Sequence, residues 1–353
     1  MSRRAFGKGK QILANRRVTE FAVHRQTNMK ANKSIGLVVG LTLIASAGMA
    51  FSHLHAKKTT VNGVGWYASF SDALVEAKQT DKPILLLSMF GHLDEDMPCA
   101  NARTLRATLF KDPEFKKLVT DDVIPAWEMV RAVPRIQIDF GDGKKITRTV
   151  RGNAVMYLVN PEGKVVDAFP GVYTSHDFIP AIRESIAQLA HADAETVIAY
   201  HKERGAMIPL SLSTGGKAAV ESPTLALIGA KPFAGAVSTY KAESPAQQKF
   251  AEAARRISDL SLTPMSPDDV VRKITGSPLA GRNMQDVAYD ILRTDSNNNM
   301  VRMRPVIHLW LASESDLPSP EKARDVVLET ILKIPFKDPY FGLRDVVLPG
   351  TPQ

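Results

Sequence analysis

Residues 82–110 have the sequence KPILLLSMFGHLDEDMPCANARTLRATLF, and this stretch decides the fold. Its first apolar run, residues 84–89, follows a Lys-Pro breaker and is interrupted by a single serine, which is typical of a central strand buried on both faces. A polar loop at 91–98 comes next, and residues 99–110 have the composition of a good helix. The pattern therefore predicts a buried strand, a loop and a helix that begins with Cys99.

The flanking sequence predicts further helices and strands around this central strand. Residues 69–80 have the spacing of an amphipathic helix, and residues 112–118 predict a short helix that begins at Asp-Pro. Residues 123–130 predict a strand that Pro125 places at an edge or makes irregular. The remaining elements are hairpins over 136–140 and 145–150 and over 154–159 and 164–169, and a closing helix over 175–190. Together these elements predict an α/β fold.

The order of these elements resembles the thioredoxin-like superfamily over residues 60–192. The residues that carry the resemblance are the Lys82 to Leu87 run, Cys99, the Phe110 to Phe115 segment and the Ala154 to Gly163 segment. The resemblance implies a thioredoxin-like central sheet with flanking helices, and in it Cys99 matches the nucleophilic cysteine at the start of a helix.

Two positions depart from the family's pattern. The second cysteine of the family falls on Ala102, and the family's cis-proline falls on Ala154. Cys99 is the single cysteine of the chain, so one chain cannot cycle between a dithiol and a disulfide. Ordinary thioredoxin activity is therefore not expected.

Three interpretations of Cys99 follow. It is a small, half-buried residue without chemistry, or it is a single working thiol whose pKa is lowered by the helix N-terminus, with Arg103 holding a thiolate or a bound anion. Cys99 and Arg103 are accordingly the candidate catalytic residues. The third interpretation is a metal site, for example for copper, made by Cys99 with His92, Asp94, Asp96 and Met97. Solvation and negative charge at the helix N-terminus explain the acidic loop better, so no cofactor is predicted.

The N-terminal region predicts a membrane segment. Residues 35–51 form an uncharged, mostly apolar run, and we take 35–55 as a transmembrane anchor or signal segment. The basic residues 1–34 then lie in the cytoplasm, and the rest of the chain lies outside. Counted from Met29, the same region has the features of a cleaved secretory signal. Either alternative predicts an extracytoplasmic protein, at the inner membrane or in the periplasm.

The net charge of +8 belongs to this N-terminal segment. Residues 1–34 contain nine basic residues and one acidic residue, and the rest of the chain has equal numbers of each. A nucleic-acid site needs basic residues gathered on a folded surface. Nucleic acid is therefore not an expected partner.

After a thioredoxin-like domain at 60–205, residues 206–243 are rich in Ser, Gly, Pro and Ala and predict a linker. Residues 244–353 predict a small, mainly helical domain whose end, from Phe336, is turn-rich and apolar enough to pack across a surface. Its predicted helices are 245–260, 267–274, 284–293, 301–312 and 320–333.

These observations lead to two functional hypotheses. The first is a membrane-anchored envelope protein that uses a thioredoxin-like fold to bind other envelope proteins, as an accessory subunit of a larger membrane complex. The alternative is a single-thiol redox enzyme, a thiol peroxidase or mixed-disulfide reductase, that acts through Cys99. The reactivity of the Cys99 thiol distinguishes them.

Overall fold

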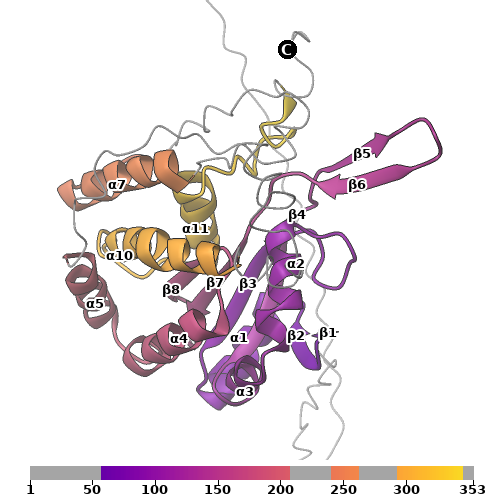
Figure 1. Cartoon of the computed structure of the whole chain (residues 1–353). Coiled ribbons are helices and arrows are strands. Elements are labelled where there is room, and N and C mark those ends of the chain that lie inside the picture. The colour runs from indigo at the N-terminus through magenta and orange to yellow at the C-terminus, as the bar shows by residue number, and fades with distance from the viewer. Residues whose placement is uncertain (1–56, 207–239, 262–291, 345–353) are drawn as a thin grey trace, which may run out of the picture. The chain divides into compact units, whose positions relative to one another are not determined.

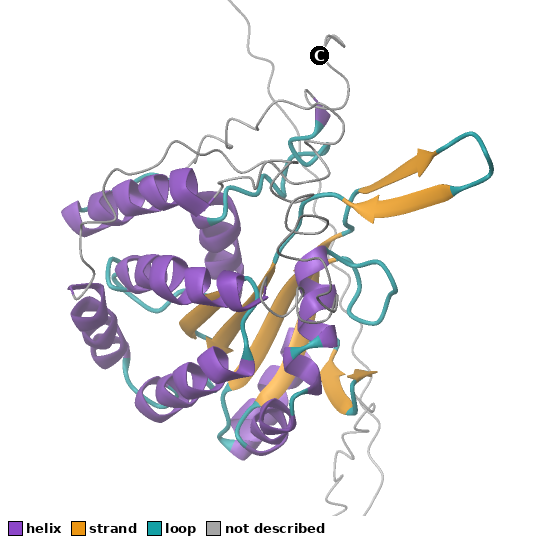
Figure 2. Cartoon of the chain, in the orientation of Figure 1, coloured by secondary structure: helices purple, strands orange, loops and turns teal. Residues whose placement is uncertain are grey.

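The computed structural model describes residues 57–206, 240–261 and 292–344. A mixed six-stranded sheet with the order β1-β2-β4-β3-β7-β8 lies at the centre, with helices packed around it (Figures 1 and 2). Its strands are β1 (Lys58–Val61), β2 (Val64–Tyr67), β3 (Ile84–Phe90), β4 (Ile124–Arg131), β7 (Ala154–Val159) and β8 (Val165–Pro170). The predicted α/β fold is confirmed at this level.

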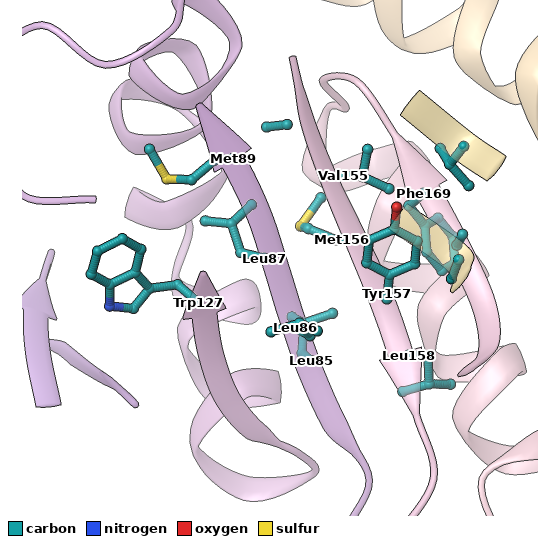
Figure 3. Close-up of a cluster of buried hydrophobic side chains, with 14 of the residues drawn as sticks. Leu85, Leu86, Leu87, Met89, Trp127, Val155, Met156, Tyr157, Leu158 and Phe169 are labelled. Carbon is teal, nitrogen blue, oxygen red and sulfur yellow. The ribbon is translucent and has the colours of Figure 1, made fainter. Parts of the chain in front are cut away.

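Strand β3 is the predicted central strand. It pairs in parallel with β4 and antiparallel with β7, and all seven of its residues are buried. Leu87 lies opposite Trp127 of β4 and Met156 of β7, and Figure 3 shows these side chains beside one another in the core. The continuous apolar run arises because both faces of this strand are covered.

Strand β4 differs from the prediction. It lies between β2 and β3 and not at an edge, although it contains Pro125. The amide of Ile124 donates to Pro83 on the β3 side, so alternation points the nitrogen of Pro125 toward β2. Pairing with β2 is limited to Tyr67 opposite Ala126. The proline therefore interrupts no ladder with β3.

Helices follow the strands nearly as predicted. They are α1 (Phe70–Thr80), α2 (Ala100–Ala107), the 3-10 turn η1 (Leu109–Lys111), α3 (Pro113–Asp121), α4 (Ser175–Leu189) and the unpredicted α5 (Ala194–Ala206). Ser69 caps α1, and Asp112 caps α3 by accepting from Glu114 and Phe115. The helix expected over 99–110 is divided, because the backbone of Thr108 leaves helical geometry between α2 and η1.

One face of the sheet is covered through an aromatic cluster. Phe115 of α3 lies 5.1 Å from Phe110 and 5.9 Å from Phe178 of α4, measured between ring centroids. Trp66 of β2 and Phe169 of β8 extend the cluster at 5.0 Å and 5.1 Å from their nearest rings. Aromatic pairs at these separations add packing energy beyond the apolar area that they bury.

The described C-terminal residues pack against the sheet and its helices. They form α7 (Pro245–Ser261), α10 (Arg304–Leu311), α11 (Pro320–Asp325) and two π-helical turns, η3 (Asn299–Met303) and η4 (Val326–Ile331). Helix α10 contacts α5, α7 and strand β8 (Figure 1). The predicted capping box of α7 is present, since Ser244 and Gln247 each accept the other's backbone amide.

The predicted helix 267–274, nearly all of 284–293 and most of the predicted linker lie outside the described residues. So does the expected membrane segment at 35–55. Among the residues that are described, no helix has the length and apolar character needed to cross a membrane.

Candidate functional site

Cys99 lies at the junction between the central strand and α2, where the sequence places it. It is the N-cap of α2, and its amide donates to the carbonyl of Phe90 at 3.0 Å. Its side chain has no exposed surface. The Sγ–H donates to the carbonyl of Asn153 at 3.3 Å. The thiol is thus enclosed between β3, α2 and the loop that precedes β7.

The electrostatic environment of this thiol favours its neutral form. Burial raises the pKa of Cys99 above its ordinary value. The backbone amides at the start of α2 and the charge of Arg103 act in the opposite direction, but burial outweighs them. A thiol that is neutral at pH 7 is a poor nucleophile and a poor metal ligand.

The loop over the thiol requires glycine at position 152. Gly152 has a φ of +88°, and a Cβ there would lie 2.9 Å from the Cβ of Cys99 and 3.1 Å from the Cβ of Phe90. Asn153 fixes the loop further, since its Oδ1 accepts from Asn101 of α2 at 2.5 Å and from the amide of Ala154 at 2.8 Å. This close contact leaves no space between the loop and the helix for a substrate atom.

Arg103 lies one turn along α2 but is directed away from the sulfur. It donates to Thr149 Oγ1 at 3.3 Å and lies 3.6 Å from Met97 Sδ. Its charge lowers the pKa of Cys99, but less than the backbone hydrogen bonds at the start of α2 do. The two candidate catalytic residues are joined by a backbone hydrogen bond, from the amide of Arg103 to the carbonyl of Cys99 at 3.1 Å, while the Arg103 guanidinium contacts Thr149 and Met97.

The residues of the candidate metal site do not converge. His92 is exposed and pairs with Asp94 at 2.5 Å, and this hydrogen bond lowers the pKa of Asp94. Asp94 and Asp96 are exposed, while Cys99 is buried. In the ranges that the structure describes, no three His, Cys, Asp or Glu side chains are grouped to hold a metal ion.

A segment near the C-terminus packs against the last residues of β3 and β4, close to Cys99. Arg131, at the end of β4, donates to the carbonyls of Phe336 at 2.8 Å, Asp338 at 2.6 Å and Pro339 at 3.2 Å. Its guanidinium lies 5.0 Å from the ring of Phe341. We call residues 336–343 the C-terminal strap. Its apolar character is visible in the sequence, but Arg131 as its anchor is not.

The strap lies close to the thiol. Phe341 is fully buried and packs edge-on against Phe90, with ring centroids 5.1 Å apart. Phe90 is also the residue whose carbonyl accepts from Cys99. In addition, the charge of Asp338 acts on Arg151, the first residue of the loop over the thiol. The strap thus adds a second layer over the surroundings of Cys99.

A second buried polar cluster joins β8 to α10. Asp167 and Arg304 form an ion pair through both carboxylate oxygens, with an Nη2–Oδ2 distance of 2.8 Å, and both side chains are buried. Ser185 of α4 donates to the same carboxylate at 2.5 Å. Burial alone would raise the pKa of Asp167, but Arg304 lowers it below its ordinary range. The sequence signal for this cluster is a charged residue inside an otherwise apolar strand.

Two histidines extend this cluster. His201 Nε2 lies 2.8 Å from the carbonyl of Val166, and His201 Nδ1 lies 2.8 Å from His308 Nδ1. A carbonyl only accepts, so Nε2 of His201 carries hydrogen and Nδ1 accepts from His308. Burial lowers the pKa of His201, and it lowers the pKa of His308 to about 2. Both rings are therefore neutral at pH 7, and the cluster attaches α5 and α10 to the sheet.

Comparison with known proteins adds no relative to this description. No protein-family profile matches the chain, and neither a curated protein nor a solved structure matches it significantly. The fold and the site define an α/β protein with a mixed six-stranded sheet and one enclosed thiol at the start of a helix.

Proposed function

We propose that this chain is a thioredoxin-like protein that binds other envelope proteins and does not perform dithiol redox chemistry. The order of its elements supports the thioredoxin-like class. A helix precedes the buried strand β3, Cys99 starts the next helix, and the antiparallel strands β7 and β8 lead to the closing helix α4.

The observation that carries the proposal is the complete burial of the Cys99 thiol. A redox cysteine must reach a disulfide or a peroxide, and it attacks as a thiolate. Here the thiol donates to Asn153, its pKa is raised, and the position one turn later in the motif is occupied by Ala102. These features favour a protein-binding role over the single-thiol enzyme.

The proposal includes the cellular location. Residues 35–55 anchor the chain in the inner membrane, and the basic segment 1–34 remains in the cytoplasm. The described domain then lies on the extracytoplasmic side, where it serves as an accessory subunit of a larger membrane complex. Cleavage of a signal beginning at Met29 would instead release it into the periplasm.

The test compares the full chain with Cys99→Ala after expression in a Gram-negative host. Membrane fractions are separated, intact masses are measured, and mixed disulfides are trapped by acid quenching and alkylation. We expect an unprocessed, membrane-bound chain with no Cys99-dependent adduct. We also expect amine-directed cross-linking to give the same partner bands for both proteins, because the thiol takes no part in binding.

The contrary results are equally specific. Adducts that disappear in Cys99→Ala, or peroxide consumption that depends on Cys99, would replace the proposal with the enzyme hypothesis. A processed chain in the soluble fraction would contradict the anchor. A variant that lacks residues 35–55 controls for fractionation, because it should leave the membrane fraction.

A further inference from the structure

Strands β5 (Arg135–Asp139) and β6 (Lys145–Thr149) form a hairpin that is separate from the central sheet. They make a two-stranded antiparallel sheet of their own, with Ile138 opposite Ile146. The hairpin extends away from the sheet and its helices (Figures 1 and 2). A two-stranded hairpin is only marginally stable by itself in water, so such an arm gains stability when another strand joins it.

The two faces of this hairpin differ in character. Ile136, Ile138 and Phe140 alternate along one face of β5, opposite Arg148, Ile146 and Lys144 of β6. Phe140 is 57% exposed and Ile146 is 37% exposed. The opposite face is polar, with Arg135, Gln137 and Asp139 on β5 opposite Thr149, Thr147 and Lys145 on β6. The β5 half of the first face is therefore apolar, and its side chains are only partly covered.

The outer edge of β5 presents backbone groups at defined positions. Phe140 donates to the carbonyl of Lys144, and Val150 donates to that of Pro134, so the even-numbered residues of β5 bond toward β6. Alternation then directs the amides and carbonyls of Arg135, Gln137 and Asp139 outward. Within the described residues, no other strand pairs with this edge.

We propose that this edge pairs with the same edge of a second copy of the chain, antiparallel and centred on Gln137. In that register the outward-facing residues lie opposite one another, as an antiparallel ladder requires. Arg135 lies opposite Asp139 of the second copy at both ends of the strand. Ile136 lies opposite Ile138 on the apolar face. Charges and apolar side chains are thus both complementary, and a four-stranded sheet β6-β5-β5-β6 results.

The sequence of the other edge does not offer the same match. Self-pairing of β6 about Thr147 would place Ile146 opposite Arg148 and Lys145 opposite Thr149, with no pair of opposite charges. The ion pairs that the arm already makes are compatible with β5 pairing. Arg135 uses Nη2 for both of its bonds, to Glu95 at 2.7 Å and to the carbonyl of Met97 at 3.2 Å, and the Asp139–Lys145 pair at 3.1 Å is half-exposed.

Site-directed cross-linking tests the proposal directly. In the full-length Cys99→Ala background, Gln137→Cys places the new thiols on the two-fold axis, where an antiparallel pair has a Cα separation of about 5.5 Å that a disulfide spans. Thr147→Cys is the matched control on the outer edge of β6. We expect mild oxidation to give a covalent dimer, twice the 38.6 kDa of one chain, for Gln137→Cys and not for Thr147→Cys. Equal yields, or a dimer for neither, would overturn the proposal.

A second experiment separates failure to pair from failure to fold. Gln137→Pro removes the outward amide at the centre of the edge without using an amide of the hairpin, and Thr147→Pro does the same on the other edge. By density-matched sedimentation in detergent, we expect loss of the dimer in the first and an unchanged dimer in the second. Circular dichroism checks that both are folded. A dimer that survives Gln137→Pro contradicts the proposal.

Charge reversal at Arg135 and Asp139 offers a third experiment, in which a mixture of two variants restores the dimer that each variant loses. Arg135→Glu and Asp139→Lys each place like charges opposite one another in a homodimer, whereas a mixture of the two variants places opposite charges at both ends. We expect each variant alone to sediment as a monomer and the mixture to recover the dimer. A mixture that stays monomeric while the unsubstituted chain dimerises would show that β5 is not the contact.

Discussion

The thiol of Cys99 donates a hydrogen bond to the carbonyl of Asn153, 54 residues further along the chain, and this contact closes the site that the sequence marks as chemically interesting. The bond links the start of α2 to the loop before β7. Because the thiol is completely buried, Cys99 and the residues around it form a packed junction between α2 and this loop.

Gly152→Ala should destabilise the protein strongly. The residue has a φ of +88°, and the added Cβ would lie 2.9 Å from the Cβ of Cys99. Gly141→Ala is the matched control, because Gly141 has a φ of +77° with nothing within 4 Å of the added Cβ. Urea unfolding should show a loss of about 1 kcal/mol for Gly141→Ala and about 2 kcal/mol or more beyond that for Gly152→Ala. Equal losses would mean that the loop is not packed on the thiol.

Arg131→Ala should release the C-terminal strap. The guanidinium holds three strap carbonyls and lies over Phe341, so its loss should cost roughly 1–3 kcal/mol in local opening free energy. Hydrogen exchange should become faster at the amides of Phe341 and Leu343, which bond within the strap. Arg148→Ala is the control, since the Arg148 guanidinium donates to the neighbouring Thr147 carbonyl, outside the strap. Unchanged exchange in Arg131→Ala would show that the strap is held by other contacts.

Asp167→Asn should be among the most destabilising substitutions in the described residues. It leaves Arg304 charged and buried without its ion partner, at a cost of about 3–5 kcal/mol. Replacement of both residues, Asp167→Leu with Arg304→Met, should cost much less because no charge remains buried. Denaturant unfolding of the three proteins measures the difference. If the double variant is as unstable as the single one, the ion pair is not the reason for the loss.

The buried histidine pair predicts acid sensitivity. The pKa values of His201 and His308 are lowered by burial, His308 to about 2, so the folded protein binds fewer protons than the unfolded chain. The stabilisation is complete above the unfolded pKa of about 6.5 and decreases as the pH falls toward the folded values. The free energy of unfolding should therefore drop by about 1.4 kcal/mol per pH unit for each histidine below pH 6.

Two single substitutions test the acid effect, one at the partly buried His308 and one at an exposed histidine. His308→Gln should reduce the slope of stability against pH between pH 6 and pH 4. His176→Gln should leave it unchanged, since the His176 side chain is 93% exposed. The same slope in both variants would assign the acid effect to carboxylates such as Asp167 instead.

The sequence was sufficient for the parts of the fold that depend on local pattern. The continuous apolar run of β3, the Asp-Pro start of α3 and the turn between β7 and β8 are all where their residues predict them. Pro125 was misleading because its effect depends on which neighbouring strand its nitrogen faces. That relation is set by pairing between distant segments and is not visible along the chain.

The site was predictable in position but not in state. A cysteine at the start of a helix is visible in the sequence, and so is the tendency of helix amides to lower its pKa. Burial of the thiol by Gly152, Asn153 and Phe90 raises the pKa instead, and these residues lie before and after Cys99 in the sequence. The pairing of Asp167 with Arg304, 137 residues apart, likewise depends on how α10 packs against β8.

The most direct test of the central claim is the rate at which an exposed-thiol reagent alkylates Cys99 in the native chain. The reference protein is the double variant Cys99→Ala/Ala107→Cys, whose single thiol lies at the exposed end of the same helix. We predict that the thiol at position 107 reacts at the rate of a free thiol. Without denaturant, Cys99 should react at least about 100-fold more slowly than that thiol, and denaturant should remove the difference by opening the fold. Fast native alkylation of Cys99, with a thiol pKa below 7, would contradict a buried, non-cycling thiol and would favour the redox enzyme.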